Sequence, residues 1–122
     1  MPYIAPEVLI RPKYSAEPAD IWSCGMVLVA MLRGELPWDR PTLDQTEYML
    51  WKEMQHEKSR IWRKIDNLVL SLLRKVLVPH PSRRYSLNHI KNHLWCKKKV
   101  WQTNIFSKTR PYENSSNFKT QA

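Results

Sequence analysis

The apolar positions of the chain are grouped in four stretches with helical spacing, and no stretch alternates between apolar and polar residues as a strand would. The most apolar stretch, residues 21–32, has apolar side chains on every face, which is typical of a buried helix. We expect Asp20 to be its N-cap, with Pro18 just ahead of the cap. Gly34, followed by Pro37, predicts its end. At ~1.5 Å per residue this helix would span about 18 Å, which is too short to cross a bilayer. We therefore predict a central core helix.

Three further helices are predicted along the chain. The second covers residues 43–54, where apolar and polar side chains mix, so we expect it at the surface. The third runs from Asp66, as N-cap, to Leu77, with apolar residues recurring at positions i, i+4 and i+7. The fourth opens at Ser86, whose hydroxyl can cap free amide groups. It is expected to direct three apolar side chains toward the core: Leu87, Ile90 and Leu94. Together these helices predict an all-α fold.

The composition excludes a complete nucleotide-binding loop. The 122 residues include only two glycines, Gly25 and Gly34, whereas the dinucleotide fingerprint and the P-loop both need several closely spaced glycines. With 43% apolar residues and six tryptophans, the chain is long enough for one domain and too apolar to be disordered throughout. Its cysteines, Cys24 and Cys96, lie far apart and follow no signal peptide, so we expect reduced thiols in an intracellular protein. Cys24 is expected in the core.

Positive charge is concentrated in the last part of the chain. The net charge is +9, and residues 96–122 contain six basic side chains and one acidic side chain. Because the apolar periodicity fades after Leu94, we predict a partial domain over residues 1–98 and a basic, flexible tail or linker over residues 99–122. The three consecutive lysines from Lys97 are fewer than a dedicated phosphate-binding segment usually has. We expect neither specific nucleic-acid binding nor membrane binding.

One group of residues has the spacing of metal ligands. His89, His93 and Cys96 fall at positions i, i+4 and i+7, so they would share one face of a helix. A zinc site needs a fourth ligand, and the sequence offers none. A location near a helix C-terminus explains His93 more simply, because a cation is favourable there. We therefore expect no metal site.

Three short motifs occur in order along the chain. Residues 2–7 are Pro-Tyr-Ile-Ala-Pro-Glu, residues 20–25 are Asp-Ile-Trp-Ser-Cys-Gly, and residues 81–86 are Pro-Ser-Arg-Arg-Tyr-Ser. In this order they resemble three landmarks of eukaryotic serine/threonine protein kinases: the end of the activation segment, the start of the central buried helix, and the Pro-x-x-Arg-x-Ser/Thr motif. Residues 34–39, Gly-Glu-Leu-Pro-Trp-Asp, narrow the resemblance to the checkpoint type within the CAMK-like group. The resemblance implies the C-terminal part of a kinase C-lobe, from the end of the activation segment through the last helices.

The resemblance also implies structural roles for four residues. Glu7 and Arg84 would form a buried ion pair, for which the planar guanidinium is suited because it binds a carboxylate at two points. Without the motifs, both would be read as ordinary surface charges. Asp20 would accept hydrogen bonds from backbone amides of a catalytic loop that these residues do not include. Trp22 is expected in the core rather than at a ligand.

Pro2, Tyr3 and Ile4 match the loop that, in this family, receives the substrate residue just after the phosphorylated serine or threonine. An apolar substrate-binding pocket is therefore one expectation for these three residues. The alternative is that Tyr3 and Ile4 only hold the segment against the central helix. No residue of the chain matches a catalytic position of the family.

The resemblance implies a protein kinase of the cell-cycle or DNA-damage checkpoint type, found in nucleus and cytoplasm. Such an enzyme transfers the γ-phosphate of ATP, with Mg²⁺, to serine or threonine in protein substrates, and regulatory proteins are further partners. The 122 residues contain no glycine-rich loop, no His-Arg-Asp motif and no Asp-Phe-Gly motif, all of which phosphoryl transfer needs. We therefore expect this chain by itself to bind no ATP and to be inactive.

Met1 falls inside the matched activation segment, so we expect a partial sequence, a truncated gene model or a degenerate kinase copy. In that case part of the apolar helix would lack its neighbours and be exposed. The alternative function is a non-catalytic helical interaction module. Its docking face would be the second predicted helix, where Tyr48, Leu50 and Trp51 offer an aromatic and aliphatic set.

Overall fold

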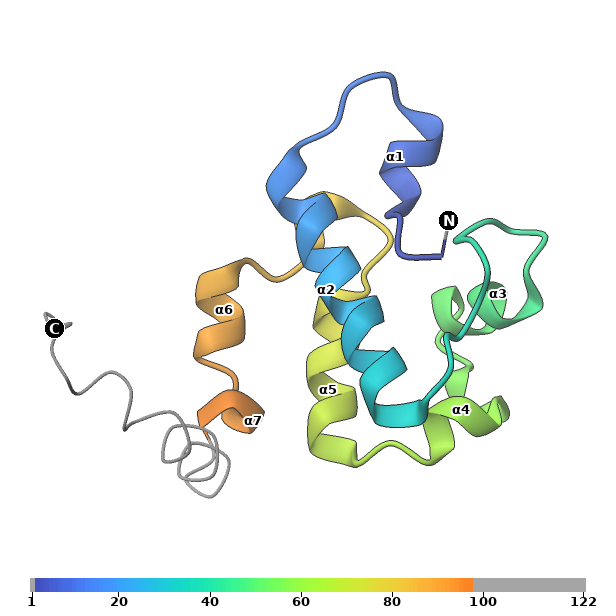
Figure 1. The fold of residues 1–122 in the computed structure, drawn as a ribbon, viewed down its shortest axis with the longest axis vertical. Coiled ribbons are helices and arrows are strands. Elements are labelled where there is room, and N and C mark those ends of the chain that lie inside the picture. Colours follow the sequence, from blue (N-terminus) through green and yellow to red (C-terminus); the bar gives the residue numbers. More distant parts are fainter. Residues whose placement is uncertain (1, 98–122) are drawn as a thin grey trace, which may run out of the picture.

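The computed structural model describes residues 2–97, and this part of the chain is built from helices without any strand. The elements in order are α1 (Pro6–Ile10), α2 (Ala16–Arg33), α3 (Thr46–Lys52), η1 (His56–Lys58), α4 (Arg60–Arg63), α5 (Asn67–Val76), η2 (Pro81–Arg83), α6 (Leu87–Lys91) and α7 (Leu94–Lys97). The long helix α2 crosses the middle of the molecule, with α1 at one end (Figure 1). The predicted all-α class is confirmed. The predicted tail, residues 99–122, lies outside the described residues.

Helix α2 begins at Ala16, earlier than the sequence predicted. Its N-cap is Ser15, so the prediction that Asp20 caps this helix is wrong. Pro18 was taken to precede the helix, but it lies in the first turn, where a missing N–H costs no intrahelical hydrogen bond. The predicted end is confirmed: Gly34 has φ +73°, and its N–H donates to the carbonyl of Ala30 at 2.8 Å.

Only one side of α2 is covered within residues 2–97. Three of its apolar side chains are fully buried: Trp22, Met26 and Val29. Three others are exposed, by 44%, 73% and 42%: Val27, Met31 and Leu32. The expectation that part of this helix is exposed is therefore confirmed. Cys24 lies on the exposed side, since positions 24, 27 and 31 share a helical face, and its predicted core location is wrong.

The region around α3 is an aromatic core rather than a surface helix. Tyr48 and Trp51 are 3% and 1% exposed, so the predicted docking face over Tyr48, Leu50 and Trp51 is wrong. The reason is a set of contacts that sequence periodicity does not reveal. The ring of Trp38, from the preceding loop, lies 5.1 Å from that of Tyr48, and the ring of Trp62 in α4 lies 4.0 Å from that of Trp51. The indole N–H of Trp51 also donates to the carbonyl of Leu77 at 2.7 Å.

Helix α5 packs closely against α2. Its predicted cap is confirmed, because the Asp66 carboxylate accepts a hydrogen bond from the N–H of Leu68 at 3.0 Å. Where the two helices approach each other, Gly25 leaves room for Val76. A Cβ at position 25 would lie 2.7 Å from Val76 Cγ1, so a larger residue would push the helices apart.

The last described helices are only partly packed. Ser86 caps α6 as predicted, and its hydroxyl accepts from the N–H of His89. Ile90 packs against the core, but Leu87 and Leu94 are 57% and 70% exposed, so the prediction that they face the core is wrong. The helix ends at Lys91, and α7 begins separately, so the continuous face expected from 87 to 94 does not form.

Candidate functional site

The most heavily bonded polar site in residues 2–97 joins Glu7 of α1 to Arg84, the residue just after η2. Pro6 opens α1, a position that tolerates proline, and this places Glu7 in the first turn. The guanidinium donates two hydrogen bonds to the carboxylate, with Arg84 Nη1 2.8 Å from Glu7 Oε2 and Nη2 2.9 Å from Oε1. Both side chains are buried, at 0% and 3% exposure. The structure thus brings together two sequence positions that are 77 residues apart.

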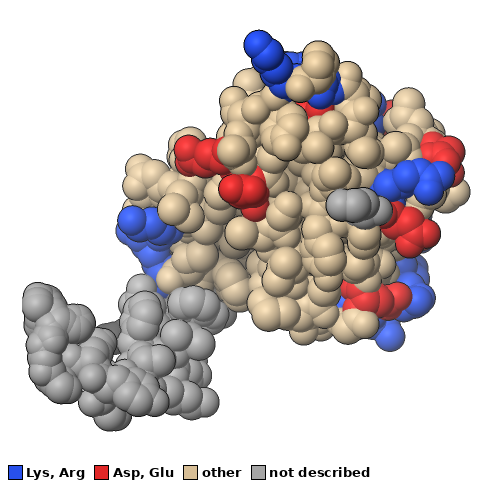
Figure 2. All heavy atoms as spheres, turned by 45° about the horizontal axis from the view of Figure 1, so that its top comes forward, with Lys and Arg blue, Asp and Glu red and all other residues tan. Residues whose placement is uncertain are grey.

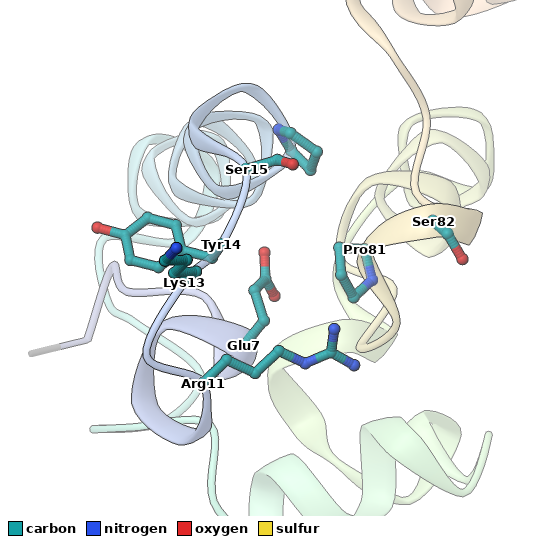
Figure 3. Close-up of a pocket in the computed structure, with 8 residues that line it drawn as sticks. Glu7, Arg11, Lys13, Tyr14, Ser15, Pro81 and Ser82 are labelled. Carbon is teal, nitrogen blue, oxygen red and sulfur yellow. The ribbon is translucent and has the colours of Figure 1, made fainter.

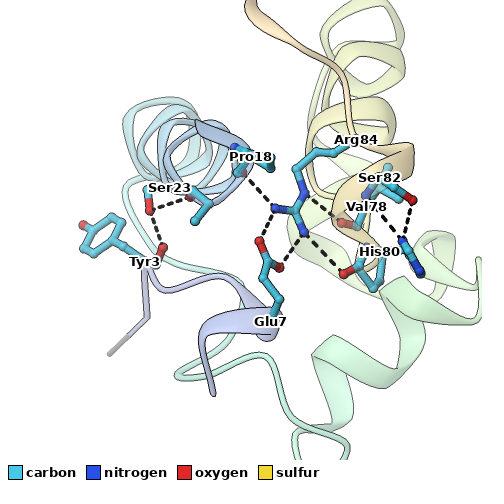
Figure 4. Close-up of polar contacts among 10 residues, drawn as sticks. Tyr3, Glu7, Pro18, Ser23, Val78, His80, Ser82 and Arg84 are labelled. Atoms are coloured by element: carbon cyan, nitrogen blue, oxygen red, sulfur yellow. Dashed lines mark hydrogen bonds and ion pairs between the residues drawn. The ribbon is translucent and has the colours of Figure 1, made fainter. Parts of the chain in front are cut away.

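Arg84 uses all five of its N–H donors in this site (Figure 4). Besides the two bonds to Glu7, it donates to the backbone carbonyls of Pro18 at 2.8 Å, Val78 at 3.0 Å and Pro79 at 3.3 Å. These carbonyls belong to the start of α2 and to the connection between α5 and η2. One side chain therefore ties three separate segments of the fold together.

The charges in this site stabilise each other. Burial by itself raises the pKa of Glu7, but hydrogen bonds from Arg84 and from the backbone, and the positive charges of Arg84 and Arg11, lower it by more. The pKa of Glu7 is therefore below its ordinary value, and the carboxylate is ionised at neutral pH. Trp22 lies beneath the pair, with its ring centroid 5.0 Å from the guanidinium carbon of Arg84. Trp22 is fully buried, which places it in the core.

The segment before α1 is attached to α2 through its backbone. The Ser23 hydroxyl lies within hydrogen-bond distance of two carbonyls, that of Tyr3 at 2.7 Å and that of Ala19 at 3.2 Å. The Tyr3 ring is 42% exposed and turns away from α2 (Figure 4), while Pro2 and Ile4 are half-buried. The three residues thus form a short strip whose backbone is held at the Tyr3 carbonyl and whose Tyr3 side chain is accessible.

Asp20 stands apart from this site. It lies in the second turn of α2 and is exposed, and its side chain makes no hydrogen bond or ion pair with residues 2–97. Of the four residues given structural roles by resemblance, the structure therefore brings three into contact and leaves Asp20 outside.

The described residues offer no metal centre. No group of three or more His, Cys, Asp or Glu side chains in this part of the chain is placed to hold a metal ion. His93 instead lies 3.0 Å from the Ser71 hydroxyl through Nε2, while its Nδ1 accepts from the N–H of Trp95. The contacts of His93 and of the Glu7–Arg84 pair each connect chain segments that are far apart in the sequence.

None of the helices over residues 2–97 is long and apolar enough to span a membrane.

Comparison with known proteins decides the family. The protein kinase domain family matches residues 1–96, which is more than three quarters of the chain. This chain belongs to the protein kinase domain family. The match includes all three motifs from which the resemblance was drawn, and it covers every helix around the Glu7–Arg84 pair.

Individual relatives are serine/threonine kinases. The chain is 48% identical over 97 residues to serine/threonine-protein kinase grp of Drosophila melanogaster, which covers 79% of this chain and 19% of that protein. It is 41% identical over 95 residues to serine/threonine-protein kinase chk-1 of Caenorhabditis elegans, covering 78% and 19%. It is 40% identical over 96 residues to serine/threonine-protein kinase CHK1 of Saccharomyces cerevisiae, covering 77% and 18%. The predicted resemblance to checkpoint-type kinases is confirmed, and the chain spans about one fifth of the length of these relatives.

Sequence reasoning missed three parts of the site. It did not predict α1, although Pro6 before an apolar stretch is a signal for a first helical turn. It did not identify Ser23 as the residue that fixes the backbone at Tyr3. It also missed the backbone carbonyls bound by Arg84, for which no sequence signal exists.

Proposed function

We propose that this chain is the base of the C-lobe in a serine/threonine protein kinase of checkpoint type. The observation that carries the proposal is the buried Glu7–Arg84 pair, which joins α1 to the rest of the helical framework. ATP and Mg²⁺ would be bound by segments outside these 122 residues, and proteins with serine or threonine acceptors would be the substrates. Residence in nucleus and cytoplasm belongs to the same proposal.

In this proposal Pro2, Tyr3 and Ile4 receive the substrate residue that follows the phosphorylated one. Two features support the role. The backbone at Tyr3 is fixed by the Ser23 hydroxyl at 2.7 Å, and the Tyr3 ring remains accessible. A rigid backbone with an exposed apolar side chain suits recognition of an extended peptide, because little ordering is needed on binding.

The 122 residues by themselves are proposed to be inactive. Phosphoryl transfer depends on positioning the triphosphate and its metal ions, and the motifs that do so are missing from this sequence. The chain contributes framework and substrate contacts, neither of which lowers the barrier of the chemical step without bound ATP. Regulatory proteins would act on the kinase of which this chain forms part.

The test compares two proteins in a radiolabelled phosphate-transfer assay with Mg²⁺, ATP and serine-containing peptides. One is the 122-residue chain, and the other is the longest product translated from transcripts that contain it. We expect transfer by the longer product and none by the 122-residue chain. Transfer by the shorter chain, or no transfer by a longer product that carries the missing motifs, would contradict the proposal.

The substrate role is tested in the active longer product with the variant Tyr3→Ala. We expect a raised KM for peptide substrates and an unchanged KM for ATP, since Tyr3 would contact only the peptide. The matched control is Ile10→Ala, which also removes an exposed apolar side chain near α1. Equal peptide KM values for Tyr3→Ala and the control would exclude the substrate role and leave the kinase assignment intact.

A further inference from the structure

A cavity of about 440 Å³ opens between the α1–α2 turn and η2, on the solvent side of the Glu7–Arg84 pair. Figure 3 shows its lining: Arg11 extends beneath Glu7 toward Pro81, and Ser15 closes the opposite side at the start of α2. The volume is in the range of sites that hold small ligands or single side chains of a peptide.

Two positive side chains, Arg11 and Lys13, line this cavity. Arg11 and Lys13 are exposed, and within residues 2–97 neither forms an ion pair. The acid in the lining is Glu7, whose two oxygens are both bound by Arg84, so that pair is neutral overall. Figure 2, which turns the top of Figure 1 toward the reader, shows Lys and Arg atoms protruding at the upper edge of this face. The cavity is therefore electropositive.

The N-terminus of α2 adds to this charge. Ser15, the N-cap, and Pro18, in the first turn, both line the cavity. Ser15 is the N-cap, yet its side chain makes no capping hydrogen bond, so its hydroxyl is available to a ligand. The N–H groups of Ala16 and Glu17 have no partners within the helix, and the dipole of this 18-residue helix favours an anion at the same end. The side chain of Glu17 is exposed and does not line the cavity.

We propose that this cavity binds a phosphorylated side chain of a peptide. A phosphate monoester carries a charge of about −2 at neutral pH, which matches Arg11 and Lys13 together. The planar guanidinium of Arg11 can bind two phosphate oxygens at once. Pro18 and Pro81 form apolar walls beside the charges, and these suit the carbon atoms and backbone of a peptide better than a free ion.

Other anionic partners fit the cavity less well. An anionic membrane is usually bound by a flat cluster of ~4–8 basic residues, whereas this site is concave and has two. Single-stranded nucleic acid needs aromatic faces for base stacking, and the one aromatic residue in the lining, Tyr14, turns its hydroxyl end away from the cavity (Figure 3). Inorganic phosphate would leave the proline walls without a contact.

The experiment measures binding to the full 122-residue chain by fluorescence anisotropy in about 100 mM NaCl, where weak surface attraction is screened. The probes are labelled heptapeptide libraries with a central phosphorylated Ser, Thr or Tyr, the same libraries without phosphate, and inorganic phosphate as competitor. We expect saturable binding of a phosphorylated library, and affinities weaker by about tenfold or more for the unphosphorylated libraries and for inorganic phosphate.

The decisive variant is Arg11→Gln combined with Lys13→Gln. Both side chains are exposed, so the fold should persist, and circular dichroism checks this. The matched control, Arg63→Gln with Lys91→Gln, removes the same charge from exposed sites outside the cavity. We expect phosphopeptide affinity to fall about tenfold or more in the first variant and to stay unchanged in the control.

Four results would each overturn the proposal: no saturable binding of any phosphorylated library, equal binding of the unphosphorylated libraries, inorganic phosphate binding as tightly as the peptides, or an equal loss of affinity in the control. The last of these would assign binding to net charge alone. Lys13→Glu gives a second check, since reversing one charge should weaken phosphopeptide binding more than neutralising it.

Discussion

Two Glu–Arg pairs in this molecule have nearly the same geometry and opposite surroundings. Arg84 binds Glu7 at 2.8 and 2.9 Å, and Arg60 binds Glu35 at 2.9 and 3.3 Å, each through the two terminal guanidinium nitrogens. The side chains of the first pair are 0% and 3% exposed, and those of the second are 63% and 39% exposed. Comparing the two pairs within one chain separates the effect of burial on stability from the effect of bond geometry.

From this difference we expect burial to decide how much each pair contributes to the free energy of unfolding. Water screens the charges of the Glu35–Arg60 pair, and either partner can be rehydrated if the other is lost. Neither partner of the Glu7–Arg84 pair can be rehydrated without opening the fold, because α1, α2 and the α5–η2 connection surround it. A partner lost from this pair leaves a buried charge.

Arg84→Ala should have the largest effect of any single change at either pair. It leaves the Glu7 carboxylate buried without a counter-charge and also removes the donors for three backbone carbonyls. We expect the free energy of unfolding to fall by about 3–5 kcal/mol or more, enough to unfold much of a small domain. Urea unfolding followed by tryptophan fluorescence measures this. A loss no larger than that of Arg60→Ala would contradict the account.

Glu7→Gln should come next. The variant keeps the shape and one oxygen acceptor but removes the negative charge, so the Arg84 guanidinium remains buried without a counter-charge. We expect a loss of about 3 kcal/mol, at the lower end of the range for broken buried pairs, because the carbonyls of Pro18 and Val78 still accept from Arg84. The same urea titration tests whether Glu7→Gln loses less stability than Arg84→Ala. Equal stability of Glu7→Gln and the unaltered chain would show that packing and not charge holds this junction.

Lowering the pH should destabilise the fold less than the substitutions at the buried pair do. The pKa of Glu7 is raised by burial but lowered by more through Arg84, the backbone and Arg11, so it is lower in the folded chain than in the unfolded one. Its stabilising contribution is therefore complete above the unfolded value of 4.5 and is lost as the pH falls through the lower folded value. The urea concentration at the unfolding midpoint should therefore decrease as the pH is lowered below about 5. The midpoints should decrease less with pH in Glu7→Gln, which has no carboxylate at this position. If the midpoints of the variant and of the unaltered chain depended on pH in the same way, Glu7 would be excluded as the titrating group.

Arg60→Ala should have the smallest effect. Its pair with Glu35 is exposed, and raising the salt concentration should reduce even the small contribution that remains. The pKa of Glu35 is lowered chiefly by the hydrogen bond from Arg60, so its titration should move back toward the ordinary value in the variant. Thermal unfolding at low and high salt measures the stability effect. A large loss at both salt concentrations would contradict the contrast between the two pairs.

Much of the fold could be predicted from sequence where the signal is local. The end of α2 at Gly34 and the cap of α5 at Asp66 depend on neighbouring residues, and both predictions are confirmed. The start of α2 was not predicted correctly, because Pro18 is compatible both with a position before a helix and with its first turn. The break after Lys91 escaped prediction as well, since no proline or glycine marks it.

Features that depend on distant parts of the chain could not be predicted from local pattern. From the local pattern Trp51 is predicted to be a surface residue of a mixed helix. The structure buries it because the rings of Trp38 and Trp62 pack against it. The Glu7–Arg84 pair was expected only through resemblance to a family, since separately both residues are typical of a surface. The carbonyl partners of Arg84 follow from the path of the backbone, which side-chain identity does not reveal.

A double-mutant cycle on Glu7→Ala and Arg84→Ala tests the central claim most directly, with Glu35→Ala and Arg60→Ala as the reference cycle in the same chain. The free energy of unfolding is measured for each single and double variant. We expect the buried double variant to lose much less stability than the two single losses combined, and the exposed cycle to be nearly additive. Additive losses at Glu7 and Arg84 would show that the two charges do not depend on each other, and would contradict the account.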